Sequence, residues 1–254
     1  MARKKPAGWV PKQHGAWAMI LVPYITGLAL AARLRPLDWG DLTLGLTWLI
    51  GYFAFNAATL WLKSPAKRRD HYQPALFTYL GIAAAFGIAT LLLKGLGILV
   101  WAPAYAVVLG TSLWLAASKR ERSLLSGVLT VVASCGLMAV LRPWPDGDPT
   151  RWADLAIMGI VTAYFVGTVF HVKALIRERN DPASARRSVV YHVALLGLIA
   201  AATAAGWVTW PWILWGLALV ARAYLMPKRA WKPAPIGIVE IVASAALLLL
   251  VLFA

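Results

Sequence analysis

Long apolar runs separated by short polar segments dominate the pattern of this 254-residue sequence. A helix needs about 20 apolar residues to cross the hydrocarbon core of a bilayer, because each residue adds only about 1.5 Å of length. Nine runs approach that length, and they cover residues 15–32, 42–62, 75–93, 96–118, 124–141, 152–176, 189–208, 210–226 and 236–254. The pattern predicts an all-α, polytopic membrane protein in which residues 1–254 form a single transmembrane domain of about nine helices.

The composition agrees with a chain embedded in lipid. Hydrophobic residues make up 61% of the sequence and charged residues 14%, whereas soluble domains carry about 45–50% and about 25%. These values exclude a soluble enzyme, a disordered protein and a nucleic-acid-binding domain, despite a net charge of +15. The expected partner is therefore the lipid bilayer and not a nucleic acid. The single cysteine excludes a disulfide framework and a CxxC metal site, and the sequence leaves the oligomeric state open.

Lysine and arginine are distributed unevenly between the two ends of the predicted helices. Cytoplasmic loops of membrane proteins carry the excess of these residues. If the N-terminus is cytoplasmic, 20 of the 25 Lys and Arg residues lie inside and five lie outside, where five Asp residues balance them. An odd number of helices then places the C-terminus outside. We predict a multi-pass protein of the cell membrane, in a bacterium the inner membrane, with a cytoplasmic N-terminus.

All four histidines fall at predicted cytoplasmic helix ends or in cytoplasmic loops. His14 stands where the first helix begins and His171 near the end of the sixth, so these two are the candidate acid/base residues if the protein is an enzyme. The alternative is that histidine is simply tolerated at a membrane interface. Neighbouring Lys and Arg residues oppose the binding of a cation, so we expect neither a metal site nor a cofactor.

Four polar side chains of the second predicted helix share one face, because they are spaced four, three and four residues apart. They are Tyr52, Asn56, Thr59 and Lys63, and Arg68 follows them in the next basic segment. Polar groups in an apolar span are expected to face the interior of the bundle rather than lipid. The stripe is either a ligand-binding face or a set of hydrogen bonds that joins helices.

The sixth predicted helix repeats this design. Tyr164, Gly167 or Thr168, and His171 share a face, and Lys173 and Arg177 follow one turn apart. Lys173 still lies inside the apolar run, so it has to reach an anion or extend to the interface.

The two polar faces together predict a cationic cavity on the cytoplasmic side. Lys and Arg bind phosphate through charge-assisted hydrogen bonds, so the cavity suits the anionic head group of an isoprenoid or a phospholipid. The residues expected to contact the phosphate are Lys63, Arg68, Lys173 and Arg177, and those expected to orient it are Asn56 and Tyr164. Tyr52 is a further candidate substrate-binding residue. The alternative is that these cations only set the topology beside anionic lipids.

Two other features have simpler interpretations. Glu240 lies about one turn into the last predicted helix, and we interpret it as an ion-pair partner of Arg222 or Lys232. Four tryptophans between positions 207 and 215 are typical of an aromatic belt at the outer interface.

Two motifs indicate a family. The segment Pro11-Lys-Gln-His-Gly-Ala-Trp-Ala-Met19 and the segment Val172-Lys-Ala-Leu-Ile-Arg-Glu-Arg179 resemble those of the YwiC-like family of bacterial integral membrane proteins. The resemblance extends over most of the chain. It implies a membrane location and brings no activity or substrate with it.

A weaker resemblance concerns the architecture. Nine helices with polar motifs after the second and the sixth look like the UbiA superfamily of intramembrane prenyltransferases, in which an N-D-x-x-D-x-x-x-D motif and a D-x-x-x-D motif hold magnesium on a prenyl diphosphate. Only Asn56 of the first motif is present here, and Ala57, Leu60 and Ser64 replace its acids. Basic residues replace the acids of the second motif. Magnesium prefers carboxylate oxygens, so the resemblance implies a UbiA-like fold whose lipid-phosphate pocket needs no metal.

The leading hypothesis is therefore a prenyltransferase-like membrane protein that binds, or transfers, an isoprenoid phosphate or diphosphate without magnesium. Two alternatives from other classes are a non-catalytic membrane partner or assembly protein, and a transporter of a small solute or lipid. Transporters favour polar sites near the middle of the membrane, whereas the polar groups here gather near one face.

Overall fold

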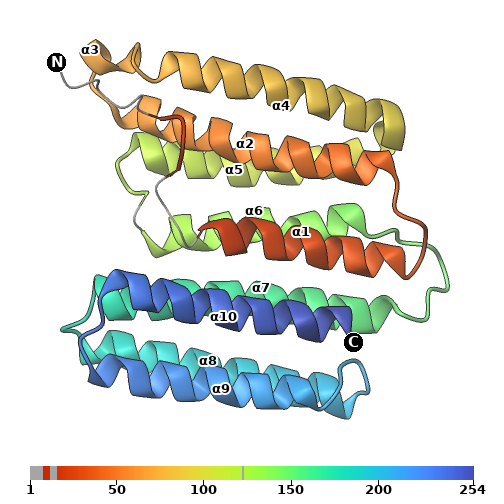
Figure 1. Cartoon of the computed structure of the whole chain (residues 1–254), viewed down its shortest axis with the longest axis vertical. Helices are drawn as coiled ribbons and strands as arrows, with labels where there is room; N and C mark the ends of the chain where they lie inside the picture. The colour runs from red at the N-terminus through yellow and green to blue at the C-terminus, as the bar shows by residue number, and fades with distance from the viewer. Residues whose placement is uncertain (1–7, 12–15, 122) are drawn as a thin grey trace. The chain divides into compact units, whose positions relative to one another are not determined.

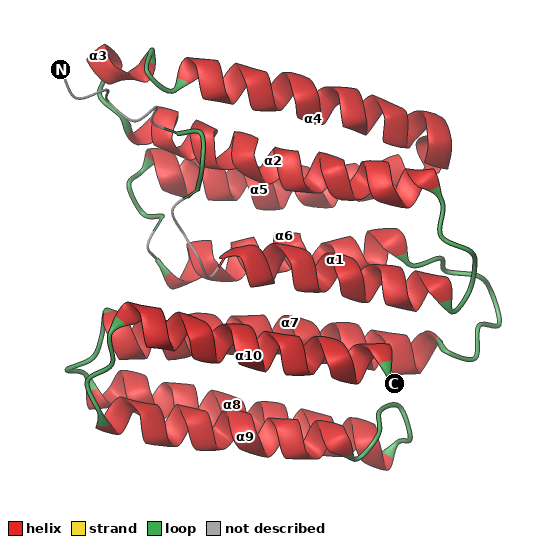
Figure 2. Ribbon diagram, in the orientation of Figure 1, coloured by secondary structure: helices red, strands yellow, loops and turns green. Residues whose placement is uncertain are grey.

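The computed structural model describes residues 8–11, 16–121 and 123–254. Over these ranges the chain is helical and has no strand (Figure 2), so the prediction of an all-α fold is confirmed. Seven helical segments are long and apolar enough to cross a membrane, and they are α2 (Trp39–Lys63), α4 (Gln73–Lys94), η1 with α5 (Leu96–Ala117), α6 (Leu124–Leu141), α7 (Arg151–Ile176), α8 (Pro182–Ala204) and α10 (Pro233–Leu252). The shorter helices are α1 (Ala16–Ala32), α3 (Ala66–Arg69), α9 (Pro211–Leu225) and η2 (Met226–Lys228).

The described chain divides into two compact units. Unit 1 contains residues 8–11, 36–121 and 123–133, and unit 2 contains residues 16–35 and 134–254. Each is a bundle of apolar helices, as expected of a multi-pass membrane protein. That the whole chain acts as one transmembrane domain stays a prediction, as do the inner-membrane location and the orientation of the termini.

In unit 1 the helices α2 and α4 lie side by side (Figure 1). Hydroxyl groups join them at one level, where the side-chain oxygens of Thr43 and Thr90 are 3.0 Å apart. Hydrogen bonds of this kind hold membrane helices together, because lipid offers hydroxyl groups no other partner.

The helix α2 begins three residues before the predicted apolar run. Asp38 and Asp41 form a capping box, in which the side chain of each accepts a hydrogen bond from the backbone N–H of the other. Lys94, at the end of α4, contacts both carboxylates at 2.9 and 2.7 Å. The capping signal was present in the sequence, but an apolar pattern alone does not detect a polar first turn.

Unit 2 is built around four consecutive helices, α7 to α10. Each packs against the next, and α10 returns to pack against α7 and α1 (Figure 1). Large side chains fill the centre, with Trp212, Phe165 and Leu247 almost inaccessible. Gly27 allows α1 to approach α6 closely, because a Cβ at this position would lie 3.0 Å from the backbone of Met138.

The helix α8 differs most from its predicted range of 189–208. It begins at Pro182, because the side chain of Asp181 accepts the N–H of Ala183 at 2.9 Å and caps the helix. It ends before Gly206, whose φ of +73° suits glycine. The first two turns are helical but polar, so the apolar pattern placed the start too late.

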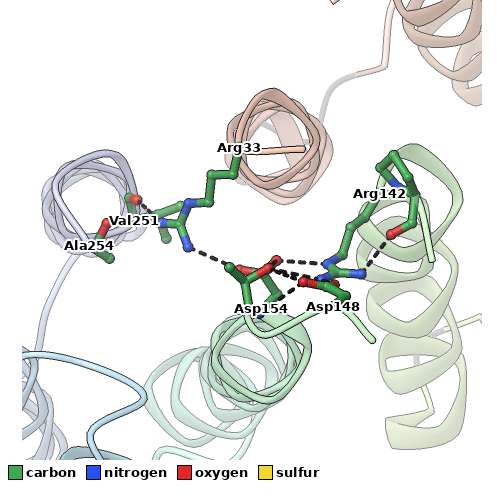
Figure 3. Close-up of polar contacts among 8 residues, drawn as sticks. Arg33, Arg142, Asp148, Asp154, Val251 and Ala254 are labelled. Carbon is green, nitrogen blue, oxygen red and sulfur yellow. Dashed lines mark hydrogen bonds and ion pairs between the residues drawn. The ribbon is translucent and has the colours of Figure 1, made fainter. Parts of the chain in front are cut away.

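A cluster of ion pairs connects the segments at the end of unit 2 that is predicted to face outward (Figure 3). Asp154, which is fully buried, accepts from Arg33 at 2.9 Å and from Arg142 at 2.7 Å. Arg142 also pairs with Asp148, and Arg33 donates to the backbone carbonyl of Ala254 at 3.1 Å. The cluster joins α1, α6, α7 and the last residues after α10, and its charges nearly cancel.

Candidate functional site

One face of α7 brings its polar side chains into the interior of unit 2. Tyr164, Thr168 and His171 are four and three residues apart, so they point the same way. Tyr164 and His171 are fully buried. The predicted polar face therefore points into the bundle, as expected of polar groups that avoid lipid.

A buried ion pair lies beside this face. The Nη1 atom of Arg222 on α9 is 2.6 Å from the Oε1 atom of Glu240 on α10, and the two residues are 8% and 7% exposed. The second carboxylate oxygen of Glu240 accepts a hydrogen bond of 3.0 Å from Thr168. The interpretation of Glu240 as an ion-pair partner of Arg222 is confirmed.

Two histidines extend this network. The Nε2 atom of His192 lies 3.1 Å from a guanidinium nitrogen of Arg222, and its Nδ1 atom lies 2.7 Å from the carbonyl oxygen of Ser188. Arg222 can only donate and a carbonyl can only accept, so Nδ1 of His192 carries the proton and the imidazole is neutral. The ring centroids of His171 and His192 are 5.9 Å apart. The Nε2 atom of His171 has no hydrogen-bond partner within the described part of the chain.

Tyr164 lies at the end of the network. Its hydroxyl is 2.9 Å from that of Ser244 and 3.3 Å from the backbone carbonyl of Glu240. We define the interior network as Tyr164, Thr168, His171, Ser188, His192, Arg222, Glu240 and Ser244. Its formal charge is zero when both imidazoles are neutral, which lowers the cost of keeping it away from water.

The network lies within the apolar part of the bundle. Arg222 is three residues from the end of α9, Glu240 seven residues into α10, and His192 ten residues into α8. At about 1.5 Å per residue these positions are about 5 to 15 Å from the helix ends. Ionisable groups at such depth are costly and often mark pathways for ions or substrates.

The second polar region is a concave surface where α7 passes into α8. It lies at the end of unit 2 where α9 ends and α10 begins. Its volume is about 570 Å³, and its lining residues are Ile176, Arg177, Glu178, Arg179, Asn180 and Asp181. Arg177 and Arg179 are exposed. This surface follows directly after a helix of membrane-spanning length.

Lys173 lies next to this surface and has an internal partner. Its Nζ atom is 2.7 Å from Glu178, which also accepts a hydrogen bond of 2.5 Å from Ser184. The bond from Lys173, followed by that from Ser184, holds the pKa of the Glu178 carboxyl below its ordinary value of 4.5. Glu178 is therefore ionised at neutral pH. The sequence leaves open whether Lys173 reaches an anion or extends to the interface, and it does not identify Glu178 as the partner.

The basic loop after α9 belongs to the same end. Leu175, Met226 and Ile236 form a buried cluster with Trp231 packed against it, and Arg179 donates to the backbone carbonyl of Trp231 at 3.5 Å. Eight cations and two acids gather here, since the only other charged residues of 173–187 and 228–232 are Glu178 and Asp181. The cations are Lys173, Arg177, Arg179, Arg186, Arg187, Lys228, Arg229 and Lys232.

Comparison with known proteins places the chain in a family. Residues 10–142 match the family model described as YwiC-like protein. A Bacillus subtilis protein described as "Uncharacterized protein YwiC" is 33% identical over 239 residues, which cover 92% of each chain. The chain belongs to the YwiC-like family. A Haemophilus influenzae protein described as uncharacterized is 27% identical over 252 residues, 96% of this chain and 98% of its own length. No solved structure matches the chain.

The YwiC-like family model covers unit 1 and the helices α1 and α6, whereas the interior network and the concave surface lie beyond residue 142. The two relatives nevertheless align over almost the whole chain. The family resemblance inferred from the two short motifs is confirmed. The likeness of this YwiC-like protein to the UbiA superfamily stays a prediction.

The predicted site residues of this YwiC-like protein fall into two groups. Tyr164, His171, Lys173 and Arg177 belong to unit 2, where Tyr164 and His171 join the interior network and Lys173 and Arg177 lie at the concave surface. Tyr52, Asn56, Lys63 and Arg68 belong to unit 1. A single cavity formed by both groups, and the roles given to its residues, stay predictions.

The unit 1 residues make local contacts in this YwiC-like protein. Lys63 lies 3.5 Å from Glu121, and the backbone carbonyl of Asn56 accepts a hydrogen bond of 2.8 Å from Thr59. Arg68 is exposed on the short helix α3, and Tyr52 is partly buried. His14 lies outside the described residues. Within the described chain no three His, Cys, Asp or Glu residues gather as metal ligands would.

Proposed function

We propose that this protein binds the phosphate head group of a lipid at the concave surface of unit 2, and that the preferred lipid is an isoprenoid phosphate or diphosphate. The observation that carries the proposal is the position of Arg177 and Arg179 on a concave surface at the strongly cationic end of a membrane-spanning bundle. Guanidinium groups bind phosphate oxygens two at a time, and a lysine adds a compact charge.

An apolar tail has a place next to such a head group. Ile176 lines the concave surface and is 43% exposed. Val190 and Val193, on the helix that begins there, are 62% and 51% exposed. A lipid whose phosphate lies at Arg177 and Arg179 would keep its hydrocarbon chain in the membrane beside these side chains.

Binding is tested by titrating the purified protein, in mild detergent, with polyprenyl phosphate, polyprenyl diphosphate, phosphatidic acid and phosphatidylglycerol under native mass spectrometry. We expect Lys173→Glu combined with Arg177→Glu to weaken binding of the polyprenyl lipids by at least about tenfold, because a phosphate loses two charge-assisted contacts and meets two negative charges. The same titration in EDTA is expected to give the same Kd, since the proposed site uses cations of the chain in place of magnesium.

The matched control changes the same net charge at the same end. Arg186 and Arg229 are exposed and lie outside the lining of the concave surface, so Arg186→Glu with Arg229→Glu should weaken binding only by about threefold or less, through long-range electrostatics. An equal loss in both double variants, or no binding by the wild-type chain, would overturn the proposal. Equal affinity for phosphatidic acid would make the ligand a lipid phosphate in general.

The interior network favours a second candidate function, proton transport. A buried Arg–Glu pair with a neutral histidine beside it resembles the polar relays that carry protons through membrane bundles. Vesicles containing the protein and a pH-sensitive dye are expected to acidify when an inside-negative potential is imposed, and Glu240→Gln should abolish the effect. Acidification no faster than in protein-free vesicles would exclude this candidate.

A further inference from the structure

Three donors from α7 and α8 converge on one carboxylate at the edge of the concave surface. Lys173 is 2.7 Å from one oxygen of Glu178, Ser184 donates to the other at 2.5 Å, and Arg187 approaches that second oxygen at 3.7 Å. An ammonium, a hydroxyl and a guanidinium group directed at one anion make up a donor set that also suits a phosphate. We call Lys173, Ser184 and Arg187 the anion seat.

Glu178, which occupies the anion seat, lies in the loop just after α7. Glu178 follows the end of α7 by two residues, and its backbone N–H donates to the carbonyl of Lys173 at 2.9 Å. Its side chain is 29% exposed. Ion pairs between partly exposed groups are weak, and the side chain can rotate toward water without unfolding either helix.

We propose, as an extension of the proposed lipid-phosphate function, that Glu178 is an internal competitor that fills the anion seat until a lipid phosphate displaces it. A phosphate monoester has three terminal oxygens and up to two negative charges, whereas the carboxylate has two oxygens and one charge. The phosphate therefore satisfies the three donors better. Arg187 also contacts Asp181 at 3.2 Å.

At neutral pH, protonation does not release the Glu178 carboxylate from the anion seat, so a phosphate has to displace it. The hydrogen bonds from Lys173 and Ser184 hold the pKa of Glu178 below 4.5, so the carboxylate stays charged, and its contacts are lost only when the pH falls through that lowered value. The other charged groups that face it are Lys173 on α7 and Arg187 on α8, with Asp181 next to Arg187.

The proposal is tested by comparing Glu178→Gln with Asp181→Asn in nanodiscs of phosphatidylcholine, using polyprenyl phosphate in one arm and phosphatidic acid in the other. Both variants remove one negative charge from the same loop. Asparagine is as good a helix N-cap as aspartate, so Asp181→Asn should leave α8 intact. We expect Glu178→Gln to bind polyprenyl phosphate about tenfold more tightly, since the amide competes poorly for Lys173, and Asp181→Asn to gain about threefold or less.

Adding Lys173→Gln to Glu178→Gln should remove most of the gain, because the two residues act on the same ligand. Unchanged or weaker binding by Glu178→Gln, or an equal gain by Asp181→Asn, would overturn the competitor role while leaving lipid binding by the wild-type chain in place. Absence of binding by the wild-type chain would overturn the lipid-phosphate function and this proposal with it. A gain confined to phosphatidic acid would assign the seat to phospholipids and reject the isoprenoid.

Discussion

Replacing Glu240 by alanine is expected to destabilise the protein by about 3–5 kcal/mol, because the guanidinium of Arg222 is left buried without a counter-charge. Arg222 is only 8% exposed, and its remaining neighbour in the interior network, His192, accepts a single hydrogen bond. The free energy of unfolding is measured by titrating the protein from mild into denaturing detergent while following its helix content.

Removing both charges is the control for Glu240→Ala. The double variant Arg222→Met with Glu240→Met should recover most of the lost stability, because a buried ion pair contributes little beyond an apolar pair of similar size. A double variant that is stable but no longer acidifies vesicles would assign the ion pair to transport. If Glu240→Ala lowers the free energy of unfolding by less than about 1 kcal/mol, water reaches Arg222 and the interior network is hydrated.

The second large effect is expected at the opposite end of unit 2. Replacing Asp154 by alanine removes the acceptor shared by Arg33 and Arg142, and Arg142 is 1% exposed. We expect a loss of about 3–5 kcal/mol in the free energy of unfolding, since a buried cation loses one of its two carboxylate partners. The same detergent titration measures it.

Arg33→Ala is the matched comparison for Asp154→Ala, because it breaks the same cluster from its exposed side. The Arg33 side chain is 26% exposed, so its removal should cost about 1 kcal/mol or less. Equal losses in the two variants would mean that the burial of Arg142 does not set the stability of this end.

The helices were predictable because each one has to satisfy a local requirement. A segment in lipid must satisfy its own backbone hydrogen bonds and present an apolar surface, and both properties are visible in a run of residues such as 124–141, which the structure forms as α6 over the same residues. The missed boundaries have equally local causes. Asp38 caps α2, Asp181 caps α8, and polar first turns follow both caps.

The polar contacts were predictable only in part. The periodicity of Tyr164, Thr168 and His171 indicated a shared face, and the isolated position of Glu240 indicated a cationic partner. Neither observation brings His192 next to Arg222, because those residues are 30 positions apart and meet only through the packing of α8 against α9. The contact between Arg33 and Asp154 joins residues 121 positions apart and has no signature in the sequence.

Local patterns along the chain therefore establish the helical class, the family and the excess of cations at one end of unit 2, since the cost of placing polar groups in lipid acts on each segment separately. Packing between distant helices decides which partners the buried charges have. It pairs Asp154 with Arg33 and Arg142 and places Glu240 against Arg222. Arg177 and Arg179 are exposed on the concave surface. The electrostatic energy of a charge depends on the groups within a few ångströms of it, and those neighbours are set by the tertiary structure.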